Sequence, residues 1–76
     1  MLFSRIQSLL AEAIQVPLEL VTADLSFGDL PQWDSLGHME IMVRLEEKFG
    51  VEVNAETIAQ LISIPEIVRY IEHNGQ

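Results

Sequence analysis

Apolar positions along the chain follow a helical period in separate stretches, with one long irregular segment between the first two. The first stretch has apolar residues at steps of three and four, which predicts an amphipathic helix over residues 2–14. Pro17 marks its end, because the residue before a proline is pushed out of the α region. The apolar positions of this stretch are Leu2, Phe3, Ile6, Leu9, Leu10, Ala13 and Ile14.

Residues 16–34 show no helical period, and Pro17, Gly28 and Pro31 interrupt them. A loop of this length is unusual in so small a protein. It nevertheless carries apolar residues, so we expect it to be pinned across the core, with a short helical turn within it. These residues are Leu20, Val21, Leu25, Phe27, Leu30 and Trp33.

A second helix is predicted over residues 34–49. Asp34 suits the N-cap, since its carboxylate can accept backbone N–H bonds and favours the positive end of the helix dipole. Gly50 suits the position just after the last turn, and Lys48 places a cation in that turn.

The rest of the chain predicts two shorter helices. Asn54 can cap a turn or two that ends at residue 61 or 62. The segment Ser63–Glu66 has the form of a capping box, with Pro65 in the tolerant first turn. The last helix carries its apolar face on Ile67, Val68 and Ile71, with Tyr70 at the edge and Asn74 and Gly75 at the end.

These elements predict an all-α protein, a four-helix bundle formed as a single domain over residues 1–76. Three helices are long, the third is short, and a long loop joins the first two. Strand-like alternation is limited to Val51 and Val53 and has no partner segment, and no internal repeat is present.

The second helix has more apolar surface than a small bundle needs. At 100° per residue, one stripe forms the core face and a second apolar patch lies on another side. The core stripe is His38, Ile41, Met42, Leu45 and Phe49, and the second patch is Leu36, Met39 and Val43, bordered by Ser35, Glu40, Glu46 and Glu47. An apolar patch with a carboxylate rim is typical of a docking surface. Alternatively, Leu36 and Val43 pack under the long loop.

Composition narrows the classes of function. Twelve acidic and four basic residues in 76 give a net charge of −8, which argues against binding to nucleic acid or to an anionic membrane and favours a basic protein partner. The chain has no cysteine, which excludes disulfides, thiolate zinc sites and cysteine nucleophiles. Its apolar runs are too short for membrane insertion. We expect a monomer in the cytoplasm.

Ser35 stands at the start of the second helix, where free N–H groups and the helix dipole favour a phosphate. On this pattern alone, the preferred interpretation is an ordinary serine that caps the helix end. A hydrolase built from Asp34, Ser35 and His38 is disfavoured, because His38 falls on the core stripe and no glycine-rich oxyanion loop is visible. His38 and His73 lie on different predicted helices without metal-ligand spacing, so we expect no metal site.

The string Asp34-Ser35-Leu36 at the start of an acidic helix resembles the attachment motif of acyl carrier proteins. Further segments follow at the family's spacing, so the resemblance covers nearly the whole chain. They are Phe27-Gly28-Asp29-Leu30 before the motif, Glu40-Ile41 and Leu45-Glu46-Glu47-Lys48-Phe49 after it, then Gly50-Val51-Glu52-Val53, Glu56 and Ile58, and Ile67 to Ile71.

The resemblance implies a non-catalytic carrier. In this family a phosphopantetheinyl transferase attaches 4′-phosphopantetheine from coenzyme A to the motif serine, here Ser35, with Asp34 and Leu36 beside it. The cofactor's thiol then holds acyl or aminoacyl groups as thioesters. Partners would include an acyl- or aminoacyl-activating ligase and ketosynthase, condensation or thioesterase-type enzymes. The docking positions implied by the family match the patch above: Leu36, Met39, Glu40, Val43, Glu46 and Glu47.

Departures from the family's usual pattern indicate a free-standing carrier of a dedicated, specialised biosynthetic pathway. Trp33 precedes the motif, Gly37 replaces a polar residue, and Arg44 and Lys48 make the second helix less acidic than in typical fatty-acid carriers. The alternatives are a carrier of primary fatty acid synthesis and, from a different class, an acidic helical adaptor protein without a cofactor.

Overall fold

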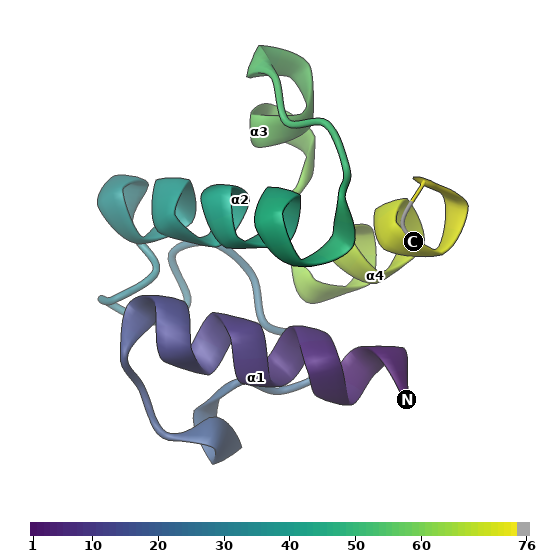
Figure 1. Ribbon diagram of the computed structural model, residues 1–76. Coiled ribbons are helices and arrows are strands. Elements are labelled where there is room, and N and C mark those ends of the chain that lie inside the picture. Colours follow the sequence, from purple (N-terminus) through teal and green to yellow (C-terminus); the bar gives the residue numbers. More distant parts are fainter. Residues whose placement is uncertain (75–76) are drawn as a thin grey trace.

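The chain forms four α-helices joined by one long loop and two short links. The computed structural model describes residues 1–74, and the predicted helix end at Gly75 falls outside them. The helices are α1 (Leu2–Ile14), α2 (Ser35–Phe49), α3 (Ala55–Gln60) and α4 (Ile64–Asn74), and a single 3-10 turn, η1 (Leu18–Leu20), lies in the loop (Figure 1). The described residues contain no strand, so the all-α prediction is confirmed.

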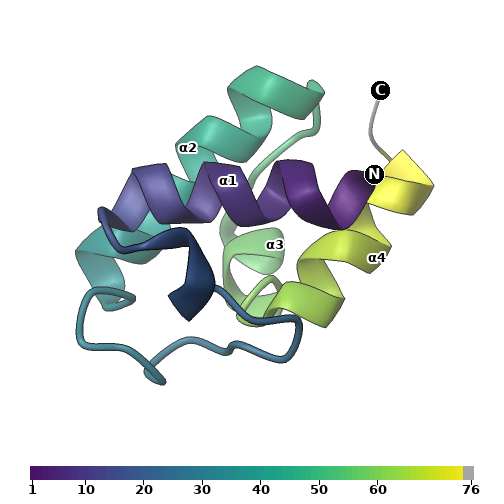
Figure 2. The same ribbon diagram turned by 90° about the horizontal axis from the view of Figure 1, so that it is seen from below.

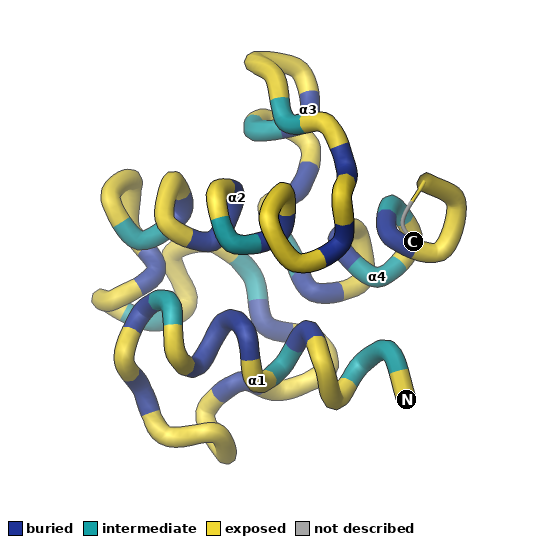
Figure 3. The backbone as a smooth tube through the Cα atoms, viewed as in Figure 1, coloured by how far each residue is buried: buried dark blue, intermediate teal, exposed yellow. Residues whose placement is uncertain are grey.

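The helices are arranged around α2. In Figure 1, α1 runs along one side of α2 and α3 stands on the other side. Figure 2, seen from below, shows α1 crossing in front of the other helices with α4 beside its N-terminal end. The core lies between α1, α2 and α4, where the tube of Figure 3 is dark blue on the facing turns. Its fully enclosed side chains include Ile6, Leu10, Ile41, Leu45 and Ile67, each 0% exposed.

The long loop crosses the open end of the bundle and is held there by backbone hydrogen bonds. The Phe27 amide donates to the Ile62 carbonyl at 2.8 Å, and the Ile64 amide donates to the Leu25 carbonyl at 2.9 Å. Pinning of the loop is therefore confirmed, with Val21, Leu25 and Trp33 buried and Leu30 partly buried. Leu20 and Phe27 are exceptions, since they are 44% and 41% exposed.

The helices begin and end close to the residues that the sequence predicts. Asp34 caps α2, and Gly50 ends it with a left-handed φ of 67°. Asn54 caps α3 in a reciprocal capping box with Thr57. The capping box at α4 is half formed: Ser63 Oγ accepts from the Glu66 amide at 3.3 Å, but the Glu66 carboxylate pairs with Arg69 instead.

Candidate functional site

The attachment-like motif forms a corner where the long loop turns into α2. Asp34 has extended backbone angles, and its Oδ1 accepts the Gly37 amide at 2.9 Å. Ser35 is the first helical residue, and it is exposed. The amides of Ser35 and Leu36 have no acceptor within the helix, because the first turn of any α-helix lacks the preceding carbonyls. The corner therefore presents a hydroxyl beside two N–H groups at the positive end of a 15-residue helix dipole.

Gly37 explains how closely the loop approaches this corner. A Cβ at this position would overlap the backbone oxygen of Gln32 and would touch Ile14 Cγ2 at 3.0 Å. The position is thus restricted to glycine by the packing of the loop and α1 against the first turn of α2. The sequence marks Gly37 as unusual without indicating this reason.

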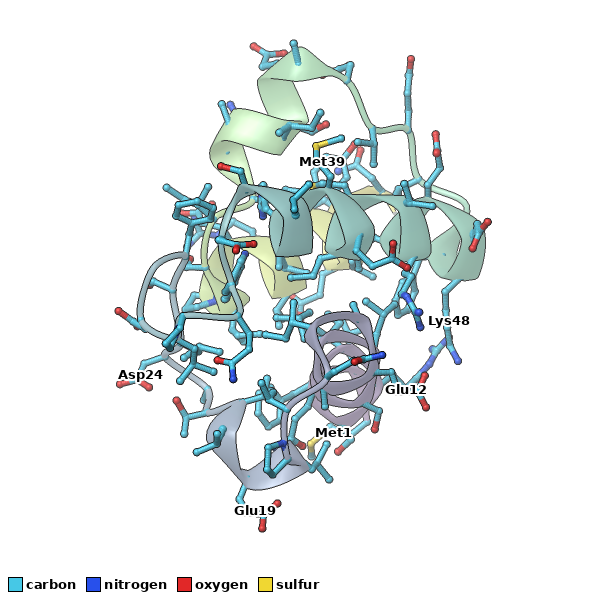
Figure 4. The ribbon with its side chains drawn as sticks, turned by 90° about the vertical axis from the view of Figure 1, so that its left-hand side faces the viewer. Met1, Glu12, Glu19, Asp24, Met39 and Lys48 are labelled. Atoms are coloured by element: carbon cyan, nitrogen blue, oxygen red, sulfur yellow. The ribbon has the colours of Figure 1, made fainter. Side chains whose placement is uncertain are left out.

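The two apolar faces of α2 are separated as the helical wheel predicts. His38, Ile41, Met42, Leu45 and Phe49 are buried. The second patch faces solvent, with Leu36 83%, Met39 44% and Val43 45% exposed. Packing of Leu36 and Val43 under the loop is therefore wrong. Figure 4 shows Met39 on the side of α2 toward α3 and Lys48 on the side toward α1, so these two residues lie on different sides of the helix.

Three exposed carboxylates, on Glu40, Glu46 and Glu47, border this apolar patch as expected. Arg44 changes the electrostatics of one of them, since its Nε bonds to Glu40 Oε2 at 2.8 Å. The same guanidinium lies 3.8 Å from Glu12 of α1. The i,i+4 pair with Glu40 could be predicted from spacing, whereas the contact with Glu12 depends on how α1 and α2 pack.

His38 is the one polar side chain in the core stripe, and both of its ring nitrogens are engaged. Nδ1 accepts from the indole Nε1 of Trp33 at 3.0 Å, and Nε2 lies 2.8 Å from the Ile58 carbonyl oxygen. His38 is 5% exposed and Trp33 is 0% exposed. The sequence predicts the burial of His38 but gives no sign of its two partners, which come from the loop and from α3.

This geometry excludes the hydrolase interpretation. A general base for Ser35 needs a ring nitrogen within hydrogen-bonding reach of the hydroxyl, and both nitrogens of His38 bond to other groups. Within residues 1–74, His, Asp and Glu side chains form no group of three that could hold a metal ion. Of the same residues, no helix combines the length and apolar character that crossing a bilayer requires.

Comparison with known proteins identifies the family. The family model described as a phosphopantetheine attachment site matches residues 4–71. An acyl carrier protein of Helicobacter pylori strain 26695 is 40% identical over 73 residues, 96% of this chain and 94% of the relative. This chain belongs to the acyl carrier protein family. An acyl carrier protein of Helicobacter acinonychis shares 36% identity over the same 73-residue length, covering 96% of this chain and 94% of the relative.

The cofactor of acyl carrier proteins is 4′-phosphopantetheine, and the corner fits its phosphate. An exposed hydroxyl at a helix N-terminus is suited to a phosphate ester, because the free amides and the dipole stabilise negative charge there. The cofactor supplies a thiol, which forms thioesters with acyl groups. The chain has no thiol of its own, because it contains no cysteine. The Asp34 carboxylate holds the Gly37 amide and leaves the amides of Ser35 and Leu36 available.

Proposed function

We propose that Ser35 carries the 4′-phosphopantetheine and that this carrier serves a dedicated biosynthetic pathway. The position of Ser35 supports this proposal best. Ser35 is exposed and is the first residue of α2, beside two backbone amides that have no acceptor within the helix. During loading, Ser35 Oγ forms a bond to the phosphorus that bears the pantetheine arm. The phosphoanhydride bond of coenzyme A breaks, adenosine 3′,5′-bisphosphate leaves, and the serine proton passes to solvent or to a base of the transferase.

The exposed face of α2 is proposed as the docking surface for a phosphopantetheinyl transferase and for the acyl-handling enzymes. Leu36, Met39 and Val43 supply apolar contact area, and Glu40, Glu46 and Glu47 attract a basic partner. Asp34 and Leu36 flank the attachment point. Asp34 acts there by fixing where the helix begins, and Leu36 acts by offering an 83% exposed apolar contact next to the modified serine.

A dedicated pathway is favoured over primary fatty acid synthesis by the chemistry around the motif. Trp33 stands directly before the motif, and Arg44 and Lys48 reduce the negative charge of α2. A partner that selects this carrier would meet a less acidic helix than a typical fatty-acid carrier presents. The chain itself would act in the cytoplasm as a monomeric carrier, with catalysis left to its ligase, ketosynthase, condensation or thioesterase-type partners.

Mass spectrometry tests the attachment. The protein is incubated with coenzyme A, magnesium and a broad-specificity phosphopantetheinyl transferase, and we expect a gain of one phosphopantetheine, mapped to Ser35 by peptide fragmentation. Ser35→Ala should remain folded and gain nothing. Ser8→Ala, which alters an exposed serine of α1, is the matched control and should load like the wild type. A wild-type protein that stays unmodified would instead support an adaptor without a cofactor.

The pathway assignment has its own test. The loaded protein is offered to a malonyl transferase of primary fatty acid synthesis, alongside a fatty-acid carrier loaded in the same way. We expect malonyl transfer to this chain to be at least tenfold slower in kcat/KM, which corresponds to about 1.4 kcal/mol. Equal transfer to both carriers would favour primary fatty acid synthesis.

A further inference from the structure

A hydrogen-bonded chain of three residues, Trp33, His38 and Ile58, lies directly behind the attachment corner. Trp33 comes two residues before Ser35, and His38 comes three residues after it. Their side chains meet in the core through the 3.0 Å bond from the indole Nε1 to Nδ1. The rings lie roughly parallel, with centroids 6.1 Å apart and an interplanar angle of 27°. The backbone that carries Ser35 is therefore closed into a short loop by a buried bond between its two flanks.

The indole donor of Trp33 determines which ring nitrogen of His38 carries the proton. An indole nitrogen can only donate, so Nδ1 of His38 must be the acceptor and carries no hydrogen. The remaining ring proton then sits on Nε2, which donates to the Ile58 carbonyl at 2.8 Å. Of the described residues, none has a buried side-chain polar atom without a partner, so this arrangement is fully satisfied. Either bond alone would leave a buried nitrogen unpaired, which is costly.

The hydrogen bond between His38 and the Ile58 carbonyl connects α3 to the same corner. The six-residue α3 stands away from α1 on the far side of α2 (Figure 1). The His38 bond joins the middle of α3 to the first turn of α2. On the opposite flank, Trp33 is fixed by its own backbone, since its amide donates to the Leu30 carbonyl at 3.0 Å and its carbonyl accepts from Gly28. The exposed Phe27 covers the histidine with an edge-on contact at 5.5 Å between ring centroids.

From this geometry we infer that Trp33 and His38 are positioning residues for the modification of Ser35, an inference that rests on the proposed function. The polar atoms of both side chains bond elsewhere than to the hydroxyl. Their bond holds the backbone on both sides of it, which limits where the hydroxyl can lie relative to the reacting phosphorus. Because Ser35 is exposed, this internal bond supplies rigidity that side chains packed around the serine do not. Small displacements of a reacting group lower the chemical rate more than they lower binding.

Two substitutions of His38 separate its two hydrogen bonds, the one with Trp33 and the one with Ile58. Asparagine places Oδ1 where histidine has Nδ1, so His38→Asn retains the acceptor for Trp33 and loses the donor to Ile58. Glutamine places its amide nitrogen where histidine has Nε2, so His38→Gln retains only the donor to Ile58. His38→Leu removes both bonds, and Trp33→Phe removes the indole donor while keeping an aromatic ring in the core.

The experiment measures single-turnover loading of Ser35 by the transferase, with coenzyme A saturating and the carrier concentration varied. We expect His38→Leu, His38→Gln and Trp33→Phe to lower the maximal loading rate about tenfold or more, with the carrier KM changed by less than about twofold. His38→Asn should recover most of the wild-type rate. In the wild type, ¹⁵N shifts of His38 should report a proton on Nε2, and the Trp33 indole proton should exchange slowly.

Two controls separate positioning from general destabilisation. Ile71→Val lowers core stability in α4, away from the corner, and its loading rate should follow the wild type when both are folded. Glu47→Lys should raise KM and spare the maximal rate. The inference is overturned if Trp33→Phe and His38→Gln load at the wild-type rate, or if all four variants lose rate only in proportion to their unfolded fraction. A wild type that is never loaded overturns the proposed function first, and the two failures are thus distinguishable.

Discussion

Arg44 Nε lies 2.8 Å from Oε2 of Glu40, one helical turn earlier on the exposed side of α2. The pair contributes little to folding, because both side chains are partly exposed and solvent screens them. Its effect is on the surface potential, since the cation offsets one of the three carboxylates that border the exposed apolar patch of Leu36, Met39 and Val43. Glu47 has no ion pair among residues 1–74 and keeps its full charge. The three acidic residues are therefore not equivalent toward a basic partner.

Charge substitutions on α2 should have unequal effects on docking. Glu47→Lys should raise the KM of loading by a transferase with a basic docking surface more than Glu40→Lys does, since Arg44 already neutralises Glu40. Arg44→Gln frees Glu40 and should lower KM by about twofold at low salt. All three effects should shrink at high salt. Steady-state loading at two salt concentrations checks this, and identical KM values for the two glutamate variants would rule out the ranking.

Gly37→Ala should destabilise the protein although alanine is the better helix former. Helix propensity alone favours alanine by about 1 kcal/mol. The new methyl group would overlap the Gln32 backbone oxygen, and overpacking of this kind costs about 1–3 kcal/mol. We expect the overpacking cost to exceed the gain in propensity, with a net loss of up to about 2 kcal/mol in urea unfolding. Ala59, exposed on α3, provides the comparison: Ala59→Gly should cost only the propensity term. A stabilised Gly37→Ala variant would show that the loop withdraws easily from α2.

Asn54→Ala should release α3 without unfolding the rest of the bundle. Asn54 Oδ1 accepts the Thr57 amide at 3.0 Å, and Thr57 Oγ1 accepts the Asn54 amide at 2.8 Å. Removing an N-cap costs about 0.5–2 kcal/mol, and a helix of six residues makes few hydrogen bonds of its own besides the contact of Ile58 with His38. Amide hydrogen exchange should accelerate in residues 55–60 while α1 keeps its protection. Uniform acceleration across all four helices would mean that α3 unfolds only with the whole chain.

Salt should stabilise the fold. Twelve carboxylates against four cations repel one another in the compact state, and added salt screens this repulsion. A gain of about 1 kcal/mol would raise Tm by roughly 4–8 °C in a domain of this size. The double variant Glu46→Gln and Glu47→Gln should start with a higher Tm at low salt and gain less from salt. A Tm that does not change with salt would show that charge repulsion is not what limits stability.

Those features that depend on one helix at a time could be predicted from the sequence. The buried and exposed sides of α2 follow from 100° per residue, so Met42 and Val43 are assigned correctly to opposite environments. Asp34 and Gly50 mark the ends of α2 because capping depends on local backbone geometry. The pair between Glu40 and Arg44 follows from i,i+4 spacing for the same reason.

Features that depend on packing between segments could not be predicted in this way. Trp33 and His38 are five positions apart, but the bond between them requires the loop to turn beneath α2. Phe27 is as apolar as its buried neighbour Leu25, and only the path of the loop across the bundle leaves it 41% exposed. The capping box at Ser63 failed in one half because Arg69, one turn further on, competes for the Glu66 carboxylate at 3.4 Å.

The bonds that seat the long loop also determine when the attachment corner can exist during synthesis. Phe27 pairs with Ile62, and Leu25 pairs with Ile64, so segments more than thirty positions apart must meet. Closing such distant contacts is slow relative to forming a helix, because the chain must first lose the entropy of a large loop. The loop can bind α1 early, through Gln7 and the carbonyls of Leu18 and Val21, but the partners of Leu25 and Phe27 come much later in the chain. A chain that still lacks residues 62–64 cannot form these two bonds, so we expect it to be a poor substrate for the transferase.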